Sequence, residues 1–257
     1  MFQIVYHTVE TTKRLGGGSV RLALVTDLHR KRWGERQELL IDALEREAPD
    51  AVLMSGDIFH HLEPFEGSRL FVEEAAKRFP CFYVTGNHEN KSDRVDEFKR
   101  FLREKGVTVL EGACKTFAAH GSKVNICGVD EYRFIGEAGM HAQLKRASAA
   151  ADPRYFTILL SHRPELIHQY LPYGFDLILC GHAHGGQWRI PFVGAIYVPE
   201  LGWLPKDDLI QGLSYLSGIP QYISPGMGSD PHYEHQPGRI FNNPVITKIT
   251  LTRKAER

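Results

Sequence analysis

The chain has 257 residues, of which 42% are hydrophobic and 24% are charged, so it is long enough to bury a sizeable core within one domain. Lys plus Arg equals Asp plus Glu at 31 each, which excludes a global positive field of the kind that draws a protein onto long nucleic acids. Recognition of any anion is therefore expected to be local.

The sequence offers no candidate for a membrane span. No segment reaches the roughly 18 uninterrupted apolar residues that a span needs, and residues 1–20 lack the apolar run of a signal peptide. We expect a cytoplasmic protein, with peripheral contact at the membrane as an alternative. The four cysteines lack the close pairing of a zinc ribbon or redox motif, so reduced, buried thiols are expected.

Short apolar runs of strand length recur along the first two thirds of the chain, and their near-continuous hydrophobicity predicts strands that are covered on both faces. These runs are residues 21–26, 51–55, 81–85, 123–129, 155–161 and 175–180. Between them lie stretches whose apolar residues return every three or four positions, which predicts helices. These stretches are residues 35–47, 69–79 and 93–105. The alternation indicates stacked helices and sheets with parallel βαβ units.

The sequence changes after Gly181 and becomes richer in Gly and Pro. Short β-like runs at 209–216, 221–224 and 245–252 predict a second, more antiparallel sheet. An aromatic and Pro-rich stretch that includes Trp188, Phe192 and Trp203 is expected to pack in the core of that sheet. The alternative is an apolar wall for a lipid-like or aromatic leaving group.

Metal-capable polar residues stand directly after the predicted strands. They are Asp27 and His29, then Asp57, then Asn87 with His88 and Glu89, then His162, and finally His182 and His184. The carboxyl ends of strands in an open α/β sheet converge on one crevice, so these side chains are expected to meet in one site.

Carboxylate, imidazole and amide oxygen together suit a divalent ion such as Mn, Fe or Zn, and one carboxylate is free to bridge two ions. A single Asp-x-His is weak evidence, and a lone His162 is more often a structural histidine. Five such clusters in order, each at the end of an apolar run, indicate a metal site.

This series of clusters resembles the signature of the calcineurin-like metallophosphoesterase superfamily. The extension of the last cluster to Gly-His-Ala-His-Gly-Gly-Gln at 181–187, with 189–191, 226–228 and 239–244, resembles one branch of bacterial phosphodiesterases associated with membrane or cell wall. That branch includes UDP-2,3-diacylglucosamine pyrophosphatases. The resemblance covers about residues 20–252 and implies a single metallophosphoesterase domain over 1–257, with the fold of a four-layer αββα sandwich with two mixed β-sheets.

The resemblance also implies a dinuclear centre of two divalent ions, Mn²⁺ first, with Fe, Zn, Mg or Ni as alternatives. One ion is expected at Asp27, His29, Asp57 and His184. The other is expected at Asp57, Asn87, His162 and His182, so that Asp57 bridges. A water that bridges the two ions would attack phosphorus in line. His88, which is not a ligand, would donate to the leaving oxygen as the catalytic acid.

One position departs from the superfamily pattern. The usual Asp three residues after the bridging carboxylate, which orients the counterpart of His88, is His60 here, so the partner of His88 stays open, with Glu89 or Asp93 as substitutes. Arg30 and Arg32 follow Asp-x-His and are substrate-binding candidates, with a solvated loop as the alternative. Trp188 is a third substrate-binding candidate.

We therefore expect a phosphodiesterase or pyrophosphatase that acts on a small or amphiphilic phosphorylated substrate. A phosphomonoesterase or nuclease on the same centre is the first alternative, although the neutral charge argues against a grip on long nucleic acid. A catalytically silent interaction scaffold is the second alternative. The oligomeric state is not predicted.

Overall fold

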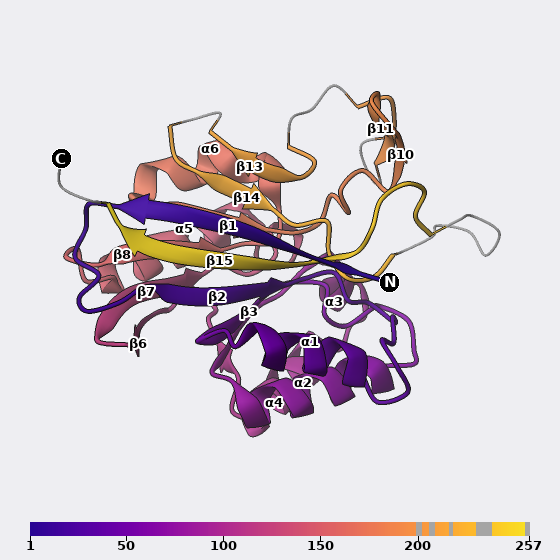
Figure 1. The fold of residues 1–257 in the computed structure, drawn as a ribbon, viewed down its shortest axis with the longest axis horizontal. Helices are drawn as coiled ribbons and strands as arrows, with labels where there is room; N and C mark the ends of the chain where they lie inside the picture. The colour runs from indigo at the N-terminus through magenta and orange to yellow at the C-terminus, as the bar shows by residue number, and fades with distance from the viewer. Residues whose placement is uncertain (199–201, 206–208, 216–217, 230–237, 255–257) are drawn as a thin grey trace.

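The structure is a computed structural model that describes residues 1–198, 202–205, 209–215, 218–229 and 238–254. Two six-stranded sheets dominate it (Figure 1). The first sheet has the order β1-β15-β2-β3-β4-β5, and all its pairs are parallel except the pair of β15 with β2. Its strands are β1 (Gln3–Thr11), β15 (Val245–Arg253), β2 (Val20–Val25), β3 (Ala51–Ser55), β4 (Cys81–Val84) and β5 (Thr108–Val109).

The second sheet has the order β13-β14-β9-β8-β7-β6, with antiparallel pairs at its two edges and parallel pairs between them. Its strands are β13 (Gly212–Ser214), β14 (Gln221–Ile223), β9 (Leu177–Cys180), β8 (Phe156–Leu160), β7 (Ser122–Gly128) and β6 (Cys114–Ala119). A small antiparallel sheet contains β10 (Trp188–Ile190), β11 (Gly194–Val198) and β12 (Gly202–Trp203).

Helices cover the outer face of each large sheet. The first sheet carries α1 (Glu38–Glu47), α2 (Glu66–Arg78) and α4 (Val95–Glu104), which lie together on one side of the strands in Figure 1. The second carries α5 (Tyr132–Ala150) and α6 (Ile167–Tyr170). The short elements α3 (Asn87–Lys91), η1 (Pro164–Leu166) and η2 (Leu171–Tyr173) complete the described helices. The four layers α, β, β and α confirm the predicted fold class.

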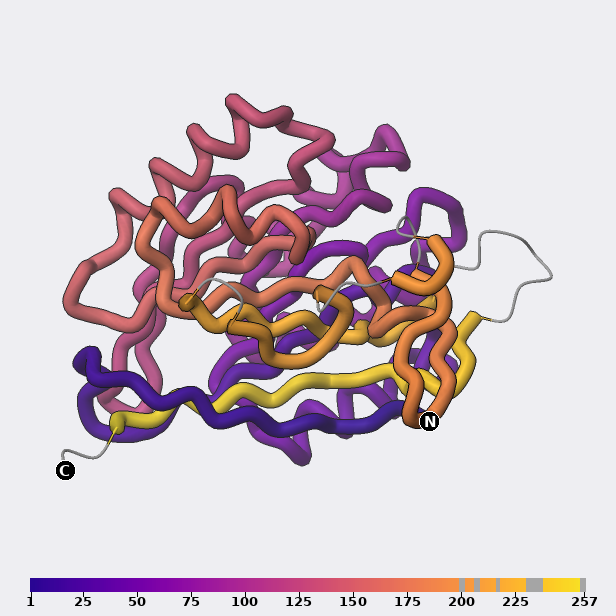
Figure 2. Tube along the Cα trace, turned by 90° about the horizontal axis from the view of Figure 1, so that it is seen from above, coloured from indigo at the N-terminus to yellow at the C-terminus, as the bar shows by residue number. Residues whose placement is uncertain are grey.

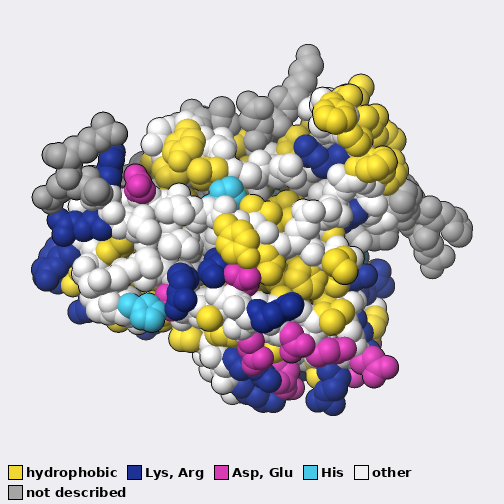
Figure 3. Space-filling view, in the orientation of Figure 1, with side chains coloured by type: hydrophobic (Ala, Val, Ile, Leu, Met, Phe, Trp, Pro, Cys, Tyr) yellow, Lys and Arg dark blue, Asp and Glu magenta, His cyan; other side chains and the backbone are white. Residues whose placement is uncertain are grey.

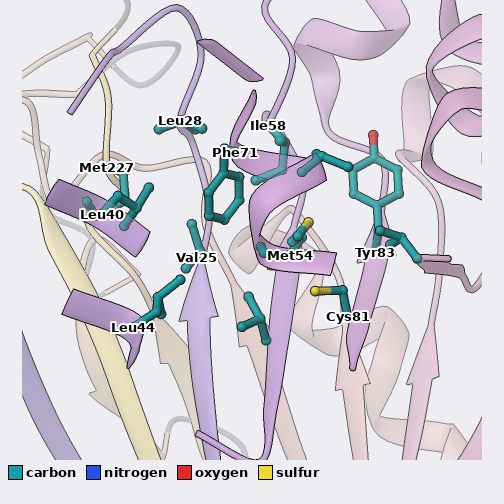
Figure 4. Packing of buried hydrophobic residues seen from close by; sticks show 14 of the residues in the cluster. Val25, Leu28, Leu40, Leu44, Met54, Ile58, Phe71, Cys81, Tyr83 and Met227 are labelled. Atoms are coloured by element: carbon teal, nitrogen blue, oxygen red, sulfur yellow. The ribbon is translucent and has the colours of Figure 1, made fainter. Parts of the chain in front are cut away.

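Three of the four hydrophobic clusters among the described residues hold these layers together. Val25 and Met54 face α1 and α2, and Figure 4 shows them beside Leu40, Leu44 and Phe71. Their strand neighbours, with Leu24 and Leu53 among them, point the other way and pack against the second sheet. Because side chains alternate along a strand, two covered faces produce the continuous apolar runs of the sequence.

The sequence located the central strands and three helices correctly, but it placed the late strands wrongly. They do not form a sheet of their own: β15 lies between β1 and β2 in the first sheet, and β14 lies parallel to β9 in the second. Figure 2 shows β1 and β15, from opposite ends of the chain, side by side. Backbone pairing between distant segments decides this arrangement, and the local pattern carries no trace of it. Residue 216 of the predicted run 209–216 lies outside the described residues.

Candidate metal centre

The predicted ligands lie on loops that follow the carboxyl ends of five strands, three in the first sheet and two in the second. Asp27 and His29 follow β2, Asp57 follows β3 and Asn87 follows β4, while His162 follows β8, and His182 and His184 follow β9. Six of these seven side chains are buried. The two sheets thus bring residues 155 positions apart in sequence into hydrogen-bonding distance, as between His29 and His184.

Five of these residues have a left-handed backbone, which is costly for side chains other than glycine. The φ angles are 50° at Asp27, 53° at His29, 52° at Asp57, 72° at His182 and 50° at His184. Such strain persists where the surrounding structure fixes it, and it gathers at functional sites. Here the left-handed backbone turns these five residues out of the line of the preceding strands and toward the common centre.

Glycines let the ligand loops approach one another. A Cβ at Gly86 would collide with the carboxylate of Asp57, and a Cβ at Gly181 would collide with the carboxylate of Asp27. A Cβ at Gly56 would collide with the His162 ring, so these three glycines are required by close approach to a ligand side chain of another loop.

The first group of metal-capable atoms comprises Asp27, His29 and His184. The Nε2 atoms of the two rings lie 3.3 Å apart, and Nε2 of His184 lies 3.8 Å from Asp27 Oδ1. Two imidazoles that share one ion, at about 2.1 Å from each nitrogen, have a similar spacing. Burial lowers the pKa of both rings, and neighbouring cationic groups lower it further, so both are neutral and able to ligate. Within the described residues, Nδ1 of each ring is buried without a hydrogen-bond partner.

The second group comprises Asp27, Asp57 and His162, and Asn87 joins it. Nε2 of His162 lies 3.2 Å from Asp57 Oδ2 and 3.1 Å from Asn87 Oδ1. The Nδ1 atom of His162 lies 2.9 Å from the Ser55 carbonyl, which accepts its proton and leaves Nε2 for a metal. Burial lowers the pKa of His162, but the Asp57 carboxylate, helped by the charges of Asp27 and Glu131, outweighs burial and raises it to about 10.

These donors fit a pair of divalent ions, because two adjacent groups share a carboxylate. Asp27 is common to both groups. The charge of Asp57 also raises the pKa of His29 and of His184 against the effect of burial, so its carboxylate acts on the first group from the second. Both carboxylates therefore lie where a bridge is needed, and Asp57 as the bridge stays a prediction.

His182 is the most exposed predicted ligand, and it contacts an ion-pair network that is buried at Arg163 and Glu131 and exposed at Glu165. Its backbone N–H donates to Asp27 at 3.1 Å, and its Nε2 lies 3.2 Å from the Arg163 guanidinium. Arg163 in turn pairs with Glu131 at 2.6 Å and with Glu165 at 2.8 Å. Sequence reasoning missed this network, although Arg163 directly follows a predicted ligand.

The partner of His88 is another histidine. His88 Nδ1 lies 2.8 Å from Nδ1 of His61, a residue that sequence reasoning also missed. His60, at the position of the usual Asp, accepts a hydrogen bond at Nδ1 from the Leu62 N–H, 3.0 Å away. The ring of His88 lies 4.6 Å from the ring of His29, centroid to centroid, which places it beside the first group.

Glu89 holds the Asp57 loop instead of orienting His88. Its buried carboxylate accepts hydrogen bonds from the backbone N–H groups of Asp57, Phe59 and Gly86, at 2.9–3.0 Å. Burial and the Asp57 charge raise the pKa of Glu89 to about 7. The other proposed substitute, Asp93, is exposed.

The substrate-binding candidates stand shortly after ligands in the chain, Arg30 and Arg32 after His29 and Trp188 after His184. Arg30 is exposed, and Arg32 forms an ion pair with Glu66, so its charge is already partnered. Trp188 is half-buried in β10, where its ring contacts Tyr197 and Trp203 at centroid distances of 4.9 and 5.4 Å. The predicted core packing of this stretch is wrong for Trp203 and for Phe192, which are exposed. The small sheet has no helix layer over it among the described elements.

Metal binding is expected to release a proton from His162. Because its pKa is raised to about 10, the ring is protonated at neutral pH without metal, and an ion must displace that proton. Metal affinity should therefore rise as the pH rises toward 10. Titration calorimetry at pH 7 in buffers of different ionisation enthalpy should show release of about one proton for the ion at this site. A heat that is independent of the buffer would contradict this.

The His61→Phe variant is expected to lower turnover by roughly 10–100-fold, the usual effect of losing a group that orients a functional histidine. Metal content should stay unchanged, since His61 belongs to none of the three metal-capable groups among the described residues, the third of which is His29, His60 and His88. The matched control is His141→Phe, because His141 is a part-buried histidine on α5 that hydrogen-bonds Tyr173. Equal turnover in the two variants would remove His61 from the site.

Comparisons with known proteins agree with this geometry. Residues 20–186 match the model of the calcineurin-like phosphoesterase family. The uncharacterized metallophosphoesterase YkuE of Bacillus subtilis is 26% identical over 95% of this chain and 86% of its own length. The phosphodiesterase YaeI of Escherichia coli is 24% identical over 89% of this chain and 82% of its own length.

A solved structure from Staphylococcus aureus, assigned as a 5′-nucleotidase, shares the fold with a TM-score of 0.51 and 14% identity. The match covers 93% of this chain and 55% of that one. The chain belongs to the calcineurin-like phosphoesterase family, and it is a metal-dependent hydrolase of phosphoric esters. Among the described helices, none is both long and apolar enough to cross a bilayer.

Proposed function

We propose that this chain, as one domain, hydrolyses a phosphodiester or pyrophosphate bond in a small amphiphilic molecule at a centre of two divalent ions, Mn²⁺ first. One observation carries the proposal: the groups Asp27–His29–His184 and Asp27–Asp57–His162 are buried side by side and share a carboxylate. The proposed ligands are Asp27, His29, Asp57, Asn87, His162, His182 and His184. Ions bound there would activate water and neutralise the phosphoryl oxygens.

The protein residues then orient the metal-binding carboxylates and supply a proton. Backbone N–H groups donate hydrogen bonds to the carboxylates. The His88 N–H donates to Asp57 Oδ1 at 2.8 Å, and the His182 N–H donates to Asp27 Oδ1 at 3.1 Å. The imidazole of His88, fixed through Nδ1 by His61, is the proposed donor to the leaving oxygen. Each oriented group reduces the reorganisation that the reaction requires.

The late branch motif supports an assignment to the Gly-His-x-His-Gly-Gly-Gln phosphodiesterases. Its two halves, far apart in sequence, meet behind the last ligand. Asn242 Nδ2 donates to the carbonyl of His184 at 2.6 Å, and Arg239 reaches the same carbonyl at 3.3 Å. Arg189 donates to the Gly185 carbonyl at 2.7 Å. The motif thus fixes the loop that presents His182 and His184.

The small sheet supports an amphiphilic substrate, because it places exposed apolar side chains next to that loop. Phe192 is fully exposed and Val193 is 71% exposed, while Trp203 and Leu204 are 66% and 69% exposed. Figure 3 shows hydrophobic side chains gathered over β10 and β11, beside Lys and Arg. Exposed patches of this kind mark sites where apolar groups bind.

A substrate panel tests the proposal. The metal-loaded chain should hydrolyse bis-p-nitrophenyl phosphate faster than p-nitrophenyl phosphate, and nucleotide-sugar lipids faster than free nucleotides. Preference for the monoester would identify a phosphomonoesterase on the same centre. Absence of turnover with Mn²⁺, Fe²⁺, Zn²⁺, Mg²⁺ and Ni²⁺ on every substrate would reject the proposal.

The exposed sheet is also expected to bring the chain to a lipid surface. In sedimentation with anionic phospholipid vesicles, the double variant Phe192→Ser/Val193→Ser should bind roughly 10–100-fold more weakly than the unaltered chain, since two apolar side chains no longer enter the bilayer interface. The matched control is Leu39→Ser/Phe134→Ser, which removes two apolar side chains that are 53% and 44% exposed elsewhere. Equal weakening in both variants would contradict the assignment of the contact to this sheet.

A further inference from the structure

The edge of the second sheet holds a pair of cysteines directly across two strands. In the antiparallel pair of β6 with β7, Cys114 stands opposite Cys127. The neighbouring pair is the hydrogen-bonded one, because Gly128 N donates to the Ala113 carbonyl at 3.2 Å. Cys114 and Cys127 therefore occupy a non-hydrogen-bonded pair, in which the Cα atoms are about 4.5 Å apart and the side chains are closest.

That spacing is within the range of disulfide-bonded residues, whose Cα atoms are about 4.4–6.8 Å apart. The two side chains stand directly opposite each other and therefore point to the same face of the sheet. Along the same face, Thr116 and Asn125 also meet across the strands, with Thr116 Oγ1 3.0 Å from Asn125 Oδ1. The strands thus hold facing side chains close together on this face of the sheet.

The two thiols differ in a way that sets their roles. Cys114 is half-buried, and the hydrogen bond from Cys127 lowers its pKa, which favours its thiolate. Cys127 is buried beneath α5, with its sulfur 3.7 Å from the Ala147 carbonyl, and its pKa is raised by the same contact. Cys114 is therefore the sulfur that an oxidant reaches first.

We propose that Cys114 and Cys127 form an oxidisable dithiol, which a hydroperoxide converts to one intramolecular disulfide. The Cys114 sulfur attacks the peroxide, the O–O bond breaks, and a sulfenic acid forms with release of water or an alcohol. The Cys127 sulfur then attacks the Cys114 sulfur, and the hydroxyl leaves as a second water with the Cys127 proton. Two thiols are oxidised while one peroxide is reduced. The bond ties the edge strand β6 to β7, and the inference is independent of the metal centre.

The test treats the folded full-length chain with hydrogen peroxide, quenches it and maps its thiols after denaturation. The four thiols should fall to two, the mass should drop by two hydrogen atoms, and one peptide pair should link Cys114 to Cys127. Dithiothreitol should restore all four thiols. Retention of four thiols, a link through Cys81 or Cys180, or sulfinic acid at Cys114 would each overturn the proposal.

Two variants separate the steps. Cys114→Ser should abolish the loss of thiols, whereas the matched variant Cys81→Ser, which alters a buried cysteine elsewhere, should retain the link. Cys127→Ser should leave Cys114 as a sulfenic acid that a 1,3-dione reagent labels. Loss of thiols in Cys114→Ser equal to that in the unaltered chain would contradict the assignment, whether or not Cys127→Ser folds.

Discussion

Asp57→Asn is expected to lower turnover on every phosphate ester by roughly 10³-fold or more, because a bridging carboxylate secures both ions and bound ions supply several kcal/mol of transition-state stabilisation. The Asp57 carboxylate lies 3.2 Å from Nε2 of His162 and accepts a hydrogen bond from the backbone N–H of His88 at 2.8 Å. Its replacement by an amide removes the charge while keeping the shape. Binding of the ion that is expected at Asp57, Asn87, His162 and His182 should weaken together with turnover.

The same variant has a second signature. Since Asp57 contributes most to the raised pKa of His162, the amide should let that pKa fall and reduce the proton release on metal binding. The matched control is Asp176→Asn, because Asp176 is a partly buried carboxylate that pairs with Lys13 at 2.7 Å. A variant of Asp57 that holds two ions tightly and turns over normally would refute the bridge.

His88→Ala is expected to keep the metal stoichiometry and to lose about 10²–10⁴-fold in turnover on a diester with a poor alkoxide leaving group, the usual scale for a positioned general acid. The loss should be much smaller when p-nitrophenolate leaves, because a stable anion needs little proton donation. General stabilisation of phosphate charge would instead slow both substrates alike. Equal losses would reject the acid role, and loss of an ion would show that His88 is a ligand.

Much of the fold could be predicted from sequence because the central strands are covered on both faces and therefore read as apolar runs. The edge strand β1 was missed, since its side chains alternate between exposed and half-buried along most of its length. Helix α5 was missed because its backbone breaks at Gly136 and its apolar face is weak. The pairing of β1 with β15 joins residues about 240 positions apart, and no local pattern records it.

The candidate site was likewise predictable from sequence only in part. Ligand types at strand ends were visible in sequence because each strand presents its last residues to one crevice. The partner of His88 was not visible, since only the folded loop brings the rings of His60 and His61 to 4.6 and 4.8 Å from that of His88, with Nδ1 of His61 at hydrogen-bonding distance. Arg163 and Glu131 likewise come together from separate loops, and only the folded chain joins them.

The most direct test of a two-ion phosphodiesterase is a metal titration followed by turnover on bis-p-nitrophenyl phosphate. The metal-free chain is loaded stepwise with Mn²⁺, and bound ions are counted by mass spectrometry of digested protein beside each rate. We expect two ions per chain at saturation, with most of the activity appearing as the second ion binds. Fewer than one bindable ion per chain, or full turnover without metal, would contradict the account.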